Sequence, residues 1–87
     1  MSDDFEPYKP IACSLYSEYE LAIIRRIKLR LGWTSLHGQK HIGYLLPLDL
    51  YTHQHVEYLA ARAIDGKRHD IRLDKIVSSD VQEAITR

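Results

Sequence analysis

The chain has 87 residues, enough for one domain with one modest hydrophobic core. Hydrophobic residues make up 45% of it and charged residues 28%, as in folded globular proteins. Lysine plus arginine and aspartate plus glutamate each number 12, so the formal net charge is zero, which argues against strong non-specific nucleic-acid binding. We therefore expect residues 1–87 to form a single folded domain.

The cysteine content and the N-terminus predict the compartment. Cys13 is the single cysteine and cannot form an intramolecular disulfide, which fits a reducing environment for so small a chain. The N-terminal residues carry neither the basic nor the apolar region of a signal peptide. No apolar stretch approaches the ~20 residues of a membrane span. The sequence therefore predicts a cytoplasmic protein without a membrane anchor.

Residues 1–13 are predicted to be an extended lead-in, because Pro7 and Pro10 disfavour a helix in the residues before them. The next segment, residues 14–25, is predicted to form a helix. Serines near its start are candidate N-caps, and its apolar residues recur at helical spacing. The serines are Ser14 and Ser17, and the apolar residues are Leu15, Tyr19, Ala22 and Ile23.

The hydrophobic period then changes from helical to two. Strict alternation over residues 27–33 indicates a half-buried strand, and a second strand is predicted over residues 39–46. Pro47 is expected to end the second strand, because proline lacks the N–H donor that a sheet requires. Residues 47–55 are then predicted to form an exposed connection.

Further antiparallel strands are predicted after residue 55. Residues 56–64 form the third strand of this prediction, and Asp65-Gly66 is the strongest hairpin signal in the chain. Residues 68–73 return as a fourth strand. A turn or bulge follows at residues 74–76, and a fifth strand is predicted either over residues 76–78 or over residues 81–85.

One helix followed by strands within residues 27–85 predicts a mainly β, α+β fold. A small antiparallel sheet has one apolar face to cover and two edges to protect. Curling into a small antiparallel β-barrel, with the N-terminal helix over its open end, meets both requirements. This is the layout of Sm-like barrels.

Catalytic and metal-binding patterns are missing from the sequence. His53 and His55 are two residues apart, but a zinc site needs three or four ligands. Cys13 follows apolar neighbours, which favours a packed thiol over a nucleophile. Glu18 and Glu20 point to different sides of the predicted helix and form no acid–base pair. We expect no enzymatic activity, no metal and no cofactor, and hence a protein that acts by binding a partner.

One alternative is an Sm-like RNA-binding module. Lys28 and Arg30 share one face of a predicted strand, and tyrosines can stack on RNA bases. The zero net charge favours a structural role for the tyrosines, but the alternative stays open. The tyrosines are Tyr8, Tyr16, Tyr19, Tyr44, Tyr51 and Tyr58.

Two segments carry a family resemblance. The first is Tyr8-Lys9-Pro10-Ile11-Ala12-Cys13, followed by Tyr16 and Glu20-Leu21-Ala22. The second is Val56-Glu57-Tyr58-Leu59, followed after a hairpin turn by Ile71-Arg72-Leu73-Asp74-Lys75-Ile76. In this order and spacing, over most of the chain, they resemble the Rof family, also called YaeO, of Rho-binding antiterminators.

The resemblance implies an Sm-like barrel with an N-terminal helix, in a bacterial cytoplasmic protein without enzymatic activity or cofactor. It implies that the partner is the transcription termination factor Rho, bound at its N-terminal, primary RNA-binding region. Occupying that region would keep RNA from engaging Rho and would inhibit termination. No DNA or membrane partner is expected, and the free protein is expected to be a monomer.

The candidate Rho contacts lie in two segments. A competitor of RNA should offer carboxylates and aromatic rings to a cleft that is lined by cations and stacking surfaces. The acids that the family carries near Ser14 and Ser17 are missing here, and residues 47–55 form a slightly longer connection. The predicted partner-binding residues are Ser14, Tyr16, Ser17, Glu18 and Glu20 on the helix, and Thr52, His53, Gln54 and His55 in the connection, with Asp3, Asp4 and Glu6 as an acidic arm.

Overall fold

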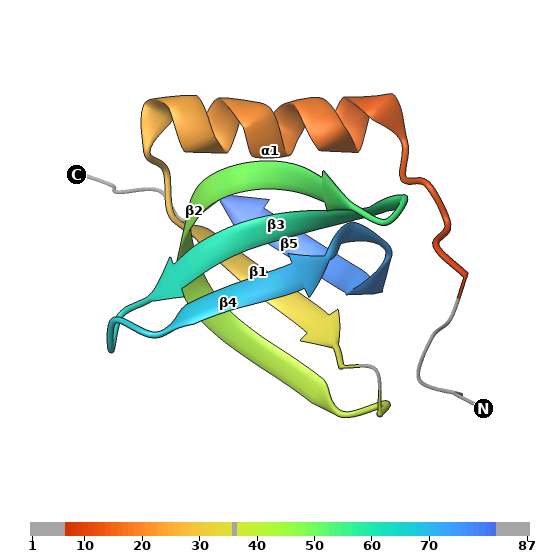
Figure 1. The fold of residues 1–87 in the computed structure, drawn as a ribbon. Coiled ribbons are helices and arrows are strands. Elements are labelled where there is room, and N and C mark those ends of the chain that lie inside the picture. The colour runs from red at the N-terminus through yellow and green to blue at the C-terminus, as the bar shows by residue number, and fades with distance from the viewer. Residues whose placement is uncertain (1–6, 36, 82–87) are drawn as a thin grey trace.

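The computed structural model describes residues 7–35 and 37–81, which form one α-helix and a five-stranded antiparallel sheet (Figure 1). The fold is therefore mainly β with one helix, as the sequence predicts. The acidic arm and residues 82–85 of the predicted fifth strand lie outside the described residues. In chain order the elements are α1 (Cys13–Arg25), β1 (Leu29–Thr34), β2 (Lys40–His53), β3 (Val56–Ala63), β4 (Arg68–Arg72), the 3-10 turn η1 (Leu73–Lys75) and β5 (Ile76–Val81).

Helix α1 confirms the predicted helical segment but not its predicted cap. Its N-cap is Ala12, whose carbonyl accepts a hydrogen bond from the backbone N–H of Tyr16 at 3.1 Å. Capping by Ser14 or Ser17 is wrong, because both residues lie inside the helix. At the other end Arg26 adopts a left-handed conformation with φ 57°, which turns the chain towards β1.

Strand β2 runs through Pro47 to His53, so the predictions that Pro47 ends the strand and that residues 47–55 form an exposed connection are wrong. The pairing explains why the proline is tolerated. Strand β1 pairs with β2 only as far as Leu45, and beyond that point the described part of β2 pairs with β3 alone. The β2–β3 register also shifts between Pro47 and Asp49, and a proline without an N–H donor fits such a bulge.

Tight turns form the β2–β3 and β3–β4 hairpins. The predicted Asp65-Gly66 turn is confirmed, with Gly66 at φ 88°. The β2–β3 turn consists of Gln54 and His55, with φ of 52° and 68°. Positive φ at both central residues is typical of the type I′ turn, which matches the twist of paired strands. A residue with a side chain is destabilised in this left-handed conformation by roughly 1–2 kcal/mol.

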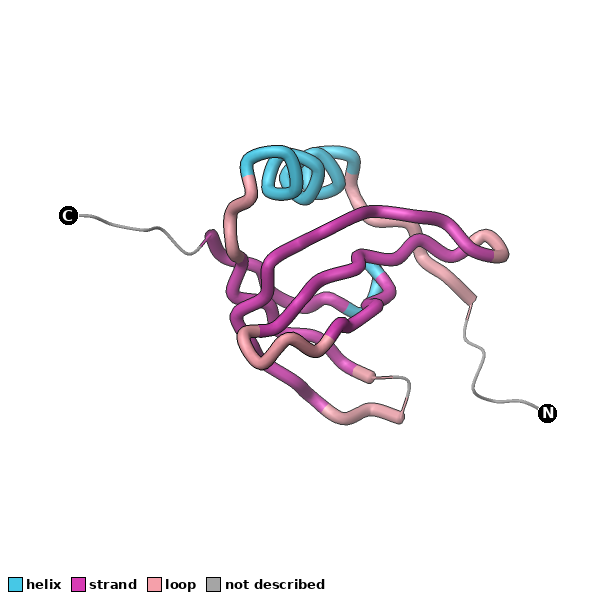
Figure 2. Tube along the Cα trace, turned by 60° about the vertical axis from the view of Figure 1, so that its left-hand side comes forward, coloured by secondary structure: helices cyan, strands magenta, loops and turns pink. Residues whose placement is uncertain are grey.

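The two edge strands of the sheet are joined by the short turn η1. The strand order is β4-β3-β2-β1-β5, so β4 and β5 lie at opposite edges although η1 separates them by three residues. The sheet therefore curls until these edges approach each other, as Figure 2 shows. Trp33 of β1 and His69 of β4 have ring centroids 5.7 Å apart across the curl. In the described part, hydrogen bonds do not close the sheet between β4 and β5, so a closed barrel stays a prediction.

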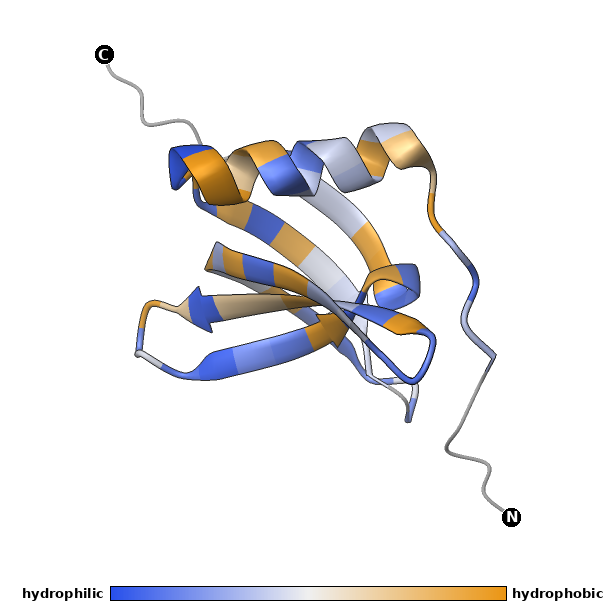
Figure 3. Ribbon diagram, turned by 45° about the horizontal axis from the view of Figure 1, so that its top comes forward, coloured by the Kyte–Doolittle hydropathy of each residue, from blue (hydrophilic) through white to orange (hydrophobic). Residues whose placement is uncertain are grey.

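The core lies between α1 and the curled sheet. Figure 3 shows hydrophilic and hydrophobic residues alternating along β1, as expected for a strand with one buried face. In the described part, no helix has the length and apolarity needed to span a bilayer. The buried core residues are Tyr19, Ala22, Leu29, Leu31, Leu45, Leu59, Ala61, Ile71 and Leu73.

We expect the double variant Gln54→Asn, His55→Gly to raise the free energy of unfolding by about 1 kcal/mol, because asparagine and glycine adopt positive φ more readily. Urea denaturation measures the change. The matched control Thr52→Asn, His53→Gly puts the same residues two positions earlier, inside β2, and should lower the stability. Destabilisation by the first variant would contradict the assigned turn.

Candidate functional site

Three carboxylates act on the Tyr16 hydroxyl through their negative charges, in the first half of α1. Glu20 follows Tyr16 by one helical turn, Asp49 lies on β2 just after the bulge, and Glu57 lies on β3. Burial raises the pKa of Tyr16, and the negative charges of the carboxylates raise it further, with Glu57 contributing most among them. The hydroxyl therefore stays protonated at neutral pH as a donor among acceptors. We call these four residues the Tyr16 flank.

The members of the Tyr16 flank differ in exposure. Tyr16 is half-buried and packs against the core cluster, and Glu57 is half-buried beside it. Glu20 and Asp49 are exposed. The two exposed carboxylates can meet a cationic partner at little desolvation cost, while the tyrosine offers part of its ring and its hydroxyl.

The lead-in segment holds Glu57 in place. The Tyr8 hydroxyl donates a hydrogen bond of 2.8 Å to Oε1 of Glu57. Burial raises the pKa of Tyr8 and this hydrogen bond raises it further, so Tyr8 stays a donor. The guanidinium of Arg72 lies 5.9 Å from the centroid of the Tyr8 ring, in the range of a cation–π contact. Tyr8 of the lead-in is thus fixed beside the Tyr16 flank.

An ion pair between Arg72 and Asp74 anchors the same region. The Arg72 Nε donates to Oδ1 at 3.0 Å and Nη2 donates to Oδ2 at 2.8 Å, in bidentate geometry. The two side chains are only 7% and 9% exposed. The pair also binds the lead-in, because the backbone N–H of Lys9 donates to Asp74 and Arg72 donates to the carbonyl of Pro7. It therefore ties β4 and η1 to the chain that precedes α1.

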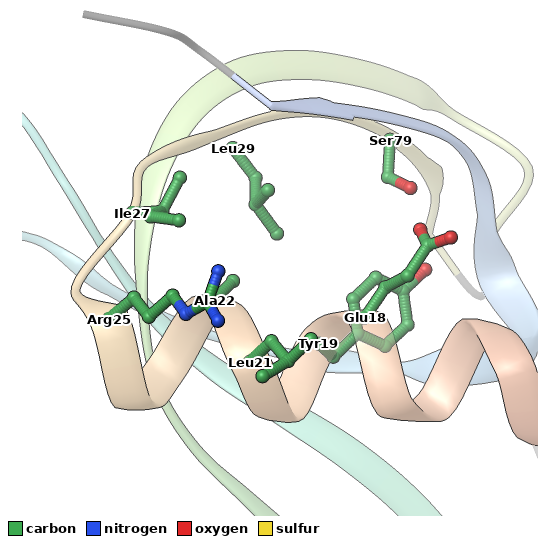
Figure 4. Close-up of a pocket in the computed structure, with 8 residues that line it drawn as sticks. All are labelled: Glu18, Tyr19, Leu21, Ala22, Arg25, Ile27, Leu29 and Ser79. Carbon is green, nitrogen blue, oxygen red and sulfur yellow. The ribbon is translucent and has the colours of Figure 1, made fainter.

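The structure divides the predicted helix residues between two flanks. Tyr16 and Glu20 lie on the side of α1 that faces β2 and β3. Glu18 is about 200° around the helix from Glu20 and lines a groove between α1, β1 and β5 (Figure 4). Ser14 and Ser17 are exposed. Glu18 therefore does not share a surface with Tyr16.

The other predicted residues form the tip of the β2–β3 hairpin. Thr52, His53, Gln54 and His55 are all exposed. Figure 1 shows this tip at the same end of the molecule as the start of α1. Thr52 lies opposite Glu57 in the β2–β3 register, so the tip is continuous with the Tyr16 flank.

Sequence reasoning missed two members of the Tyr16 flank. Asp49 falls within the predicted connection and was not predicted to bind a partner. Glu57 was named only as part of the segment that carries the family resemblance. No local pattern links either residue to Tyr16, because their proximity depends on the β2 bulge and on the packing of α1 against the sheet. The one available signal was the spacing of Tyr16 and Glu20, which places them on one helical face.

A second surface lies around Tyr44, which is 50% exposed on β2. Arg30 of β1 lies opposite Tyr44 in the register, and Lys28 and Arg62 line a shallow hollow beside it. We call Lys28, Arg30, Tyr44 and Arg62 the Tyr44 face. A neighbouring hollow shares Tyr44, Ala63 and Ile64 with the first and is lined by the rings of Trp33, His41 and His69.

Metal-ligating residues do not gather in the described part of the chain. Within residues 7–35 and 37–81, no three histidine, cysteine, aspartate or glutamate side chains lie together as a metal site requires. His53 and His55 are exposed at the hairpin tip. Cys13 is exposed at the first residue of α1, so the prediction of a packed thiol is wrong.

No protein-family model matches the sequence, and no curated protein matches it. Among solved structures, this chain is similar to the proteasome accessory factor B/C (PafBC) of Arthrobacter aurescens, with a TM-score of 0.70 and 24% sequence identity. The match covers 84% of this chain but only 12% of PafBC. A likeness at this identity shows a shared fold and nothing about activity or partners.

We expect Asp74→Asn to lower the free energy of unfolding by about 3–5 kcal/mol, because it removes the carboxylate charge from a buried bidentate ion pair. Chemical denaturation followed by circular dichroism measures the loss. Asp70→Asn is the matched control, since Arg68 and Asp70 have the same spacing but are 54% and 40% exposed. That variant should cost much less stability, because exposed ion pairs contribute little. Equal losses would contradict the anchoring role of the buried pair.

Proposed function

We propose that this protein binds Rho at its N-terminal, primary RNA-binding region and thereby inhibits Rho-dependent termination, as the resemblance to the Rof family implies. The observation that carries the proposal is the Tyr16 flank, where an aromatic hydroxyl lies near three carboxylates. A cleft that accepts single-stranded RNA offers cations and stacking surfaces, and this flank offers their complements. The mechanism is occlusion by binding, with no chemical step.

The sheet supports the proposal by supplying acids that the helix lacks. Family acids are missing near Ser14 and Ser17, but Asp49 and Glu57 add negative charge beside Tyr16. Complementary charge accelerates encounter and makes binding weaken with salt. The hairpin tip extends the same surface with polar and imidazole groups. Glu18 contributes less in this proposal, because it lies on the other flank of α1.

The curled sheet supports an Sm-like barrel as the finer description of the fold. The three-residue η1 joins strands at opposite edges, and the ring contact between Trp33 and His69 crosses the interior of the curl. Helix α1 then lies over one end of the barrel. In this proposal the protein acts in the bacterial cytoplasm, where Rho and nascent RNA meet.

The Tyr44 face supports a second candidate function, which is binding of single-stranded RNA by this chain itself. The two neighbouring hollows would place a base against aromatic rings and a phosphate near Lys28 and Arg62. Two observations weaken this candidate. Arg30 already faces Asp80 at 3.8 Å, and the net charge of the chain is zero. We therefore rank it second.

The Rho proposal predicts that saturating protein releases labelled single-stranded RNA from Rho, measured by fluorescence anisotropy. The apparent affinity should fall as salt increases, because the contact is charged. Unchanged RNA binding by Rho at saturating protein, with no complex detected by direct titration, would refute the proposal.

The double variant Glu20→Lys, Asp49→Lys should weaken binding to Rho by at least about tenfold, because it places cations against a cationic cleft. Both residues are exposed, so the fold should survive, and circular dichroism checks this. Glu18→Lys changes the other flank of α1 and should have a much smaller effect. A larger effect from Glu18→Lys would show that the Tyr16 flank is not the contact surface.

The RNA candidate predicts a gel shift with single-stranded RNA at low salt and without Rho, where electrostatic binding is strongest. Replacing Tyr44 and Arg62 together with alanine should abolish that shift, while binding to Rho stays unchanged. If the wild-type protein gives no shift at tens of micromolar concentration, the second candidate is removed and the first is unaffected.

A further inference from the structure

The groove between α1 and the edge formed by β1 and β5 is apolar along its floor and charged at its two ends. Figure 4 shows Glu18 and Arg25 towards opposite ends of the helical rim, with Leu21 between them. Leu21 is 46% exposed, and Ile24 on the adjoining helix surface is 73% exposed. Exposed apolar surface of this kind, bordered by charge, is typical of an interaction site. The groove is lined by Glu18, Tyr19, Leu21, Ala22, Arg25, Ile27, Leu29 and Ser79.

The helical rim of the groove has a fixed order of acid, apolar residue and base. Glu18 and Arg25 are seven residues apart, which places them on one side of the helix but about 10.5 Å apart along its axis. They are therefore too far apart to pair with each other. In the described part of the chain, neither side chain forms an ion pair.

An occupant of this groove has to bring an apolar surface with a cation opposite Glu18 and an anion opposite Arg25. Helix α1 itself has this pattern when its direction is reversed. We propose that a second copy of this chain is the occupant, with the two α1 helices antiparallel about a two-fold axis beside Leu21. Each Glu18 then faces Arg25 of the other copy, and the two Leu21 side chains cover each other.

Symmetry supports the antiparallel arrangement. A two-fold interface joins the same patch on both copies, so the patch has to be complementary to itself. A parallel alignment of the helices would place Glu18 against Glu18 and Arg25 against Arg25, which is repulsive. An antiparallel alignment converts both contacts into attractions, because Glu18 and Arg25 lie equally far from the point midway between Leu21 and Ala22.

The size of the contact sets its strength. One pair of short helices buries less than the ~800 Å² per partner of a standard interface, so the dimer is weak and depends on concentration. Its charge pairs make it weaken with salt. The Tyr16 flank lies on the other side of α1 and remains accessible in the dimer. The self-association therefore does not rest on the Rho proposal.

Sedimentation velocity of the purified full chain, from micromolar to millimolar concentration, tests the proposal without any partner. The wild type should pass from monomer to dimer over this range. Glu18→Arg and Arg25→Glu should each raise the dissociation constant by about tenfold or more, because attraction becomes repulsion at two symmetric places. The double variant Glu18→Arg, Arg25→Glu should restore association, because both charge pairs reform with exchanged signs.

The matched control is Glu20→Arg, which makes the same charge change on the opposite flank of α1 and should leave the dissociation constant unchanged. All substituted residues are exposed, and circular dichroism checks that each variant is folded. A wild type that stays monomeric at millimolar concentration overturns the proposal. So does a dimer that the single variants do not weaken, or a double variant that fails to recover.

Discussion

The buried ion pair between Arg72 and Asp74 links two adjoining elements, β4 and η1, to a lead-in segment that lies 65 residues earlier in the sequence. Arg72 ends β4, Asp74 lies in η1, and both bind the backbone of the lead-in through Pro7 and Lys9. The pair therefore fixes the turn between the two edge strands and the direction in which the chain enters α1. The hydrogen bond from Tyr8 to Glu57 adds a second link from the lead-in to β3. These links help to fix the start of α1, where Tyr16 lies.

A net charge of zero conceals an uneven distribution of charge. Carboxylates gather at the end where α1 begins, from the helix, β2 and β3. Cations gather at the end where α1 finishes, with Arg25 and Arg26 on the chain and Lys28 and Arg62 in the hollow beside Tyr44. Figure 1 shows that these ends are separated by the length of the helix. One small domain can therefore offer a cationic partner and an anionic partner separate surfaces, so the two candidate functions do not exclude each other.

Helix α1 has a different environment on each of its sides. Its centre packs into the core through Tyr19 and Ala22. One flank meets Asp49 and Glu57 of the sheet, and the other borders the apolar groove with Glu18 and Arg25. Residues two positions apart in sequence, such as Glu18 and Glu20, thus serve different surfaces, because they differ by about 200° around the helix axis. Candidate contact residues that are neighbours in the sequence of α1 can therefore lie on different surfaces, and the two flanks have to be tested separately.

Local sequence patterns predicted the helix, the alternation in β1, the Asp65-Gly66 turn and the turn before β5, because each depends on residues that are near neighbours. The sequence also predicted that Tyr16 and Glu20 share one helical face, because they are one turn apart. The continuation of β2 through Pro47 could not be predicted from local patterns, since it depends on where β1 stops pairing. Likewise, Asp49 and Glu57 approach Tyr16 only because a bulge and the packing of α1 bring them there. Local patterns carry no information about contacts between strands and a helix that are joined by long stretches of chain.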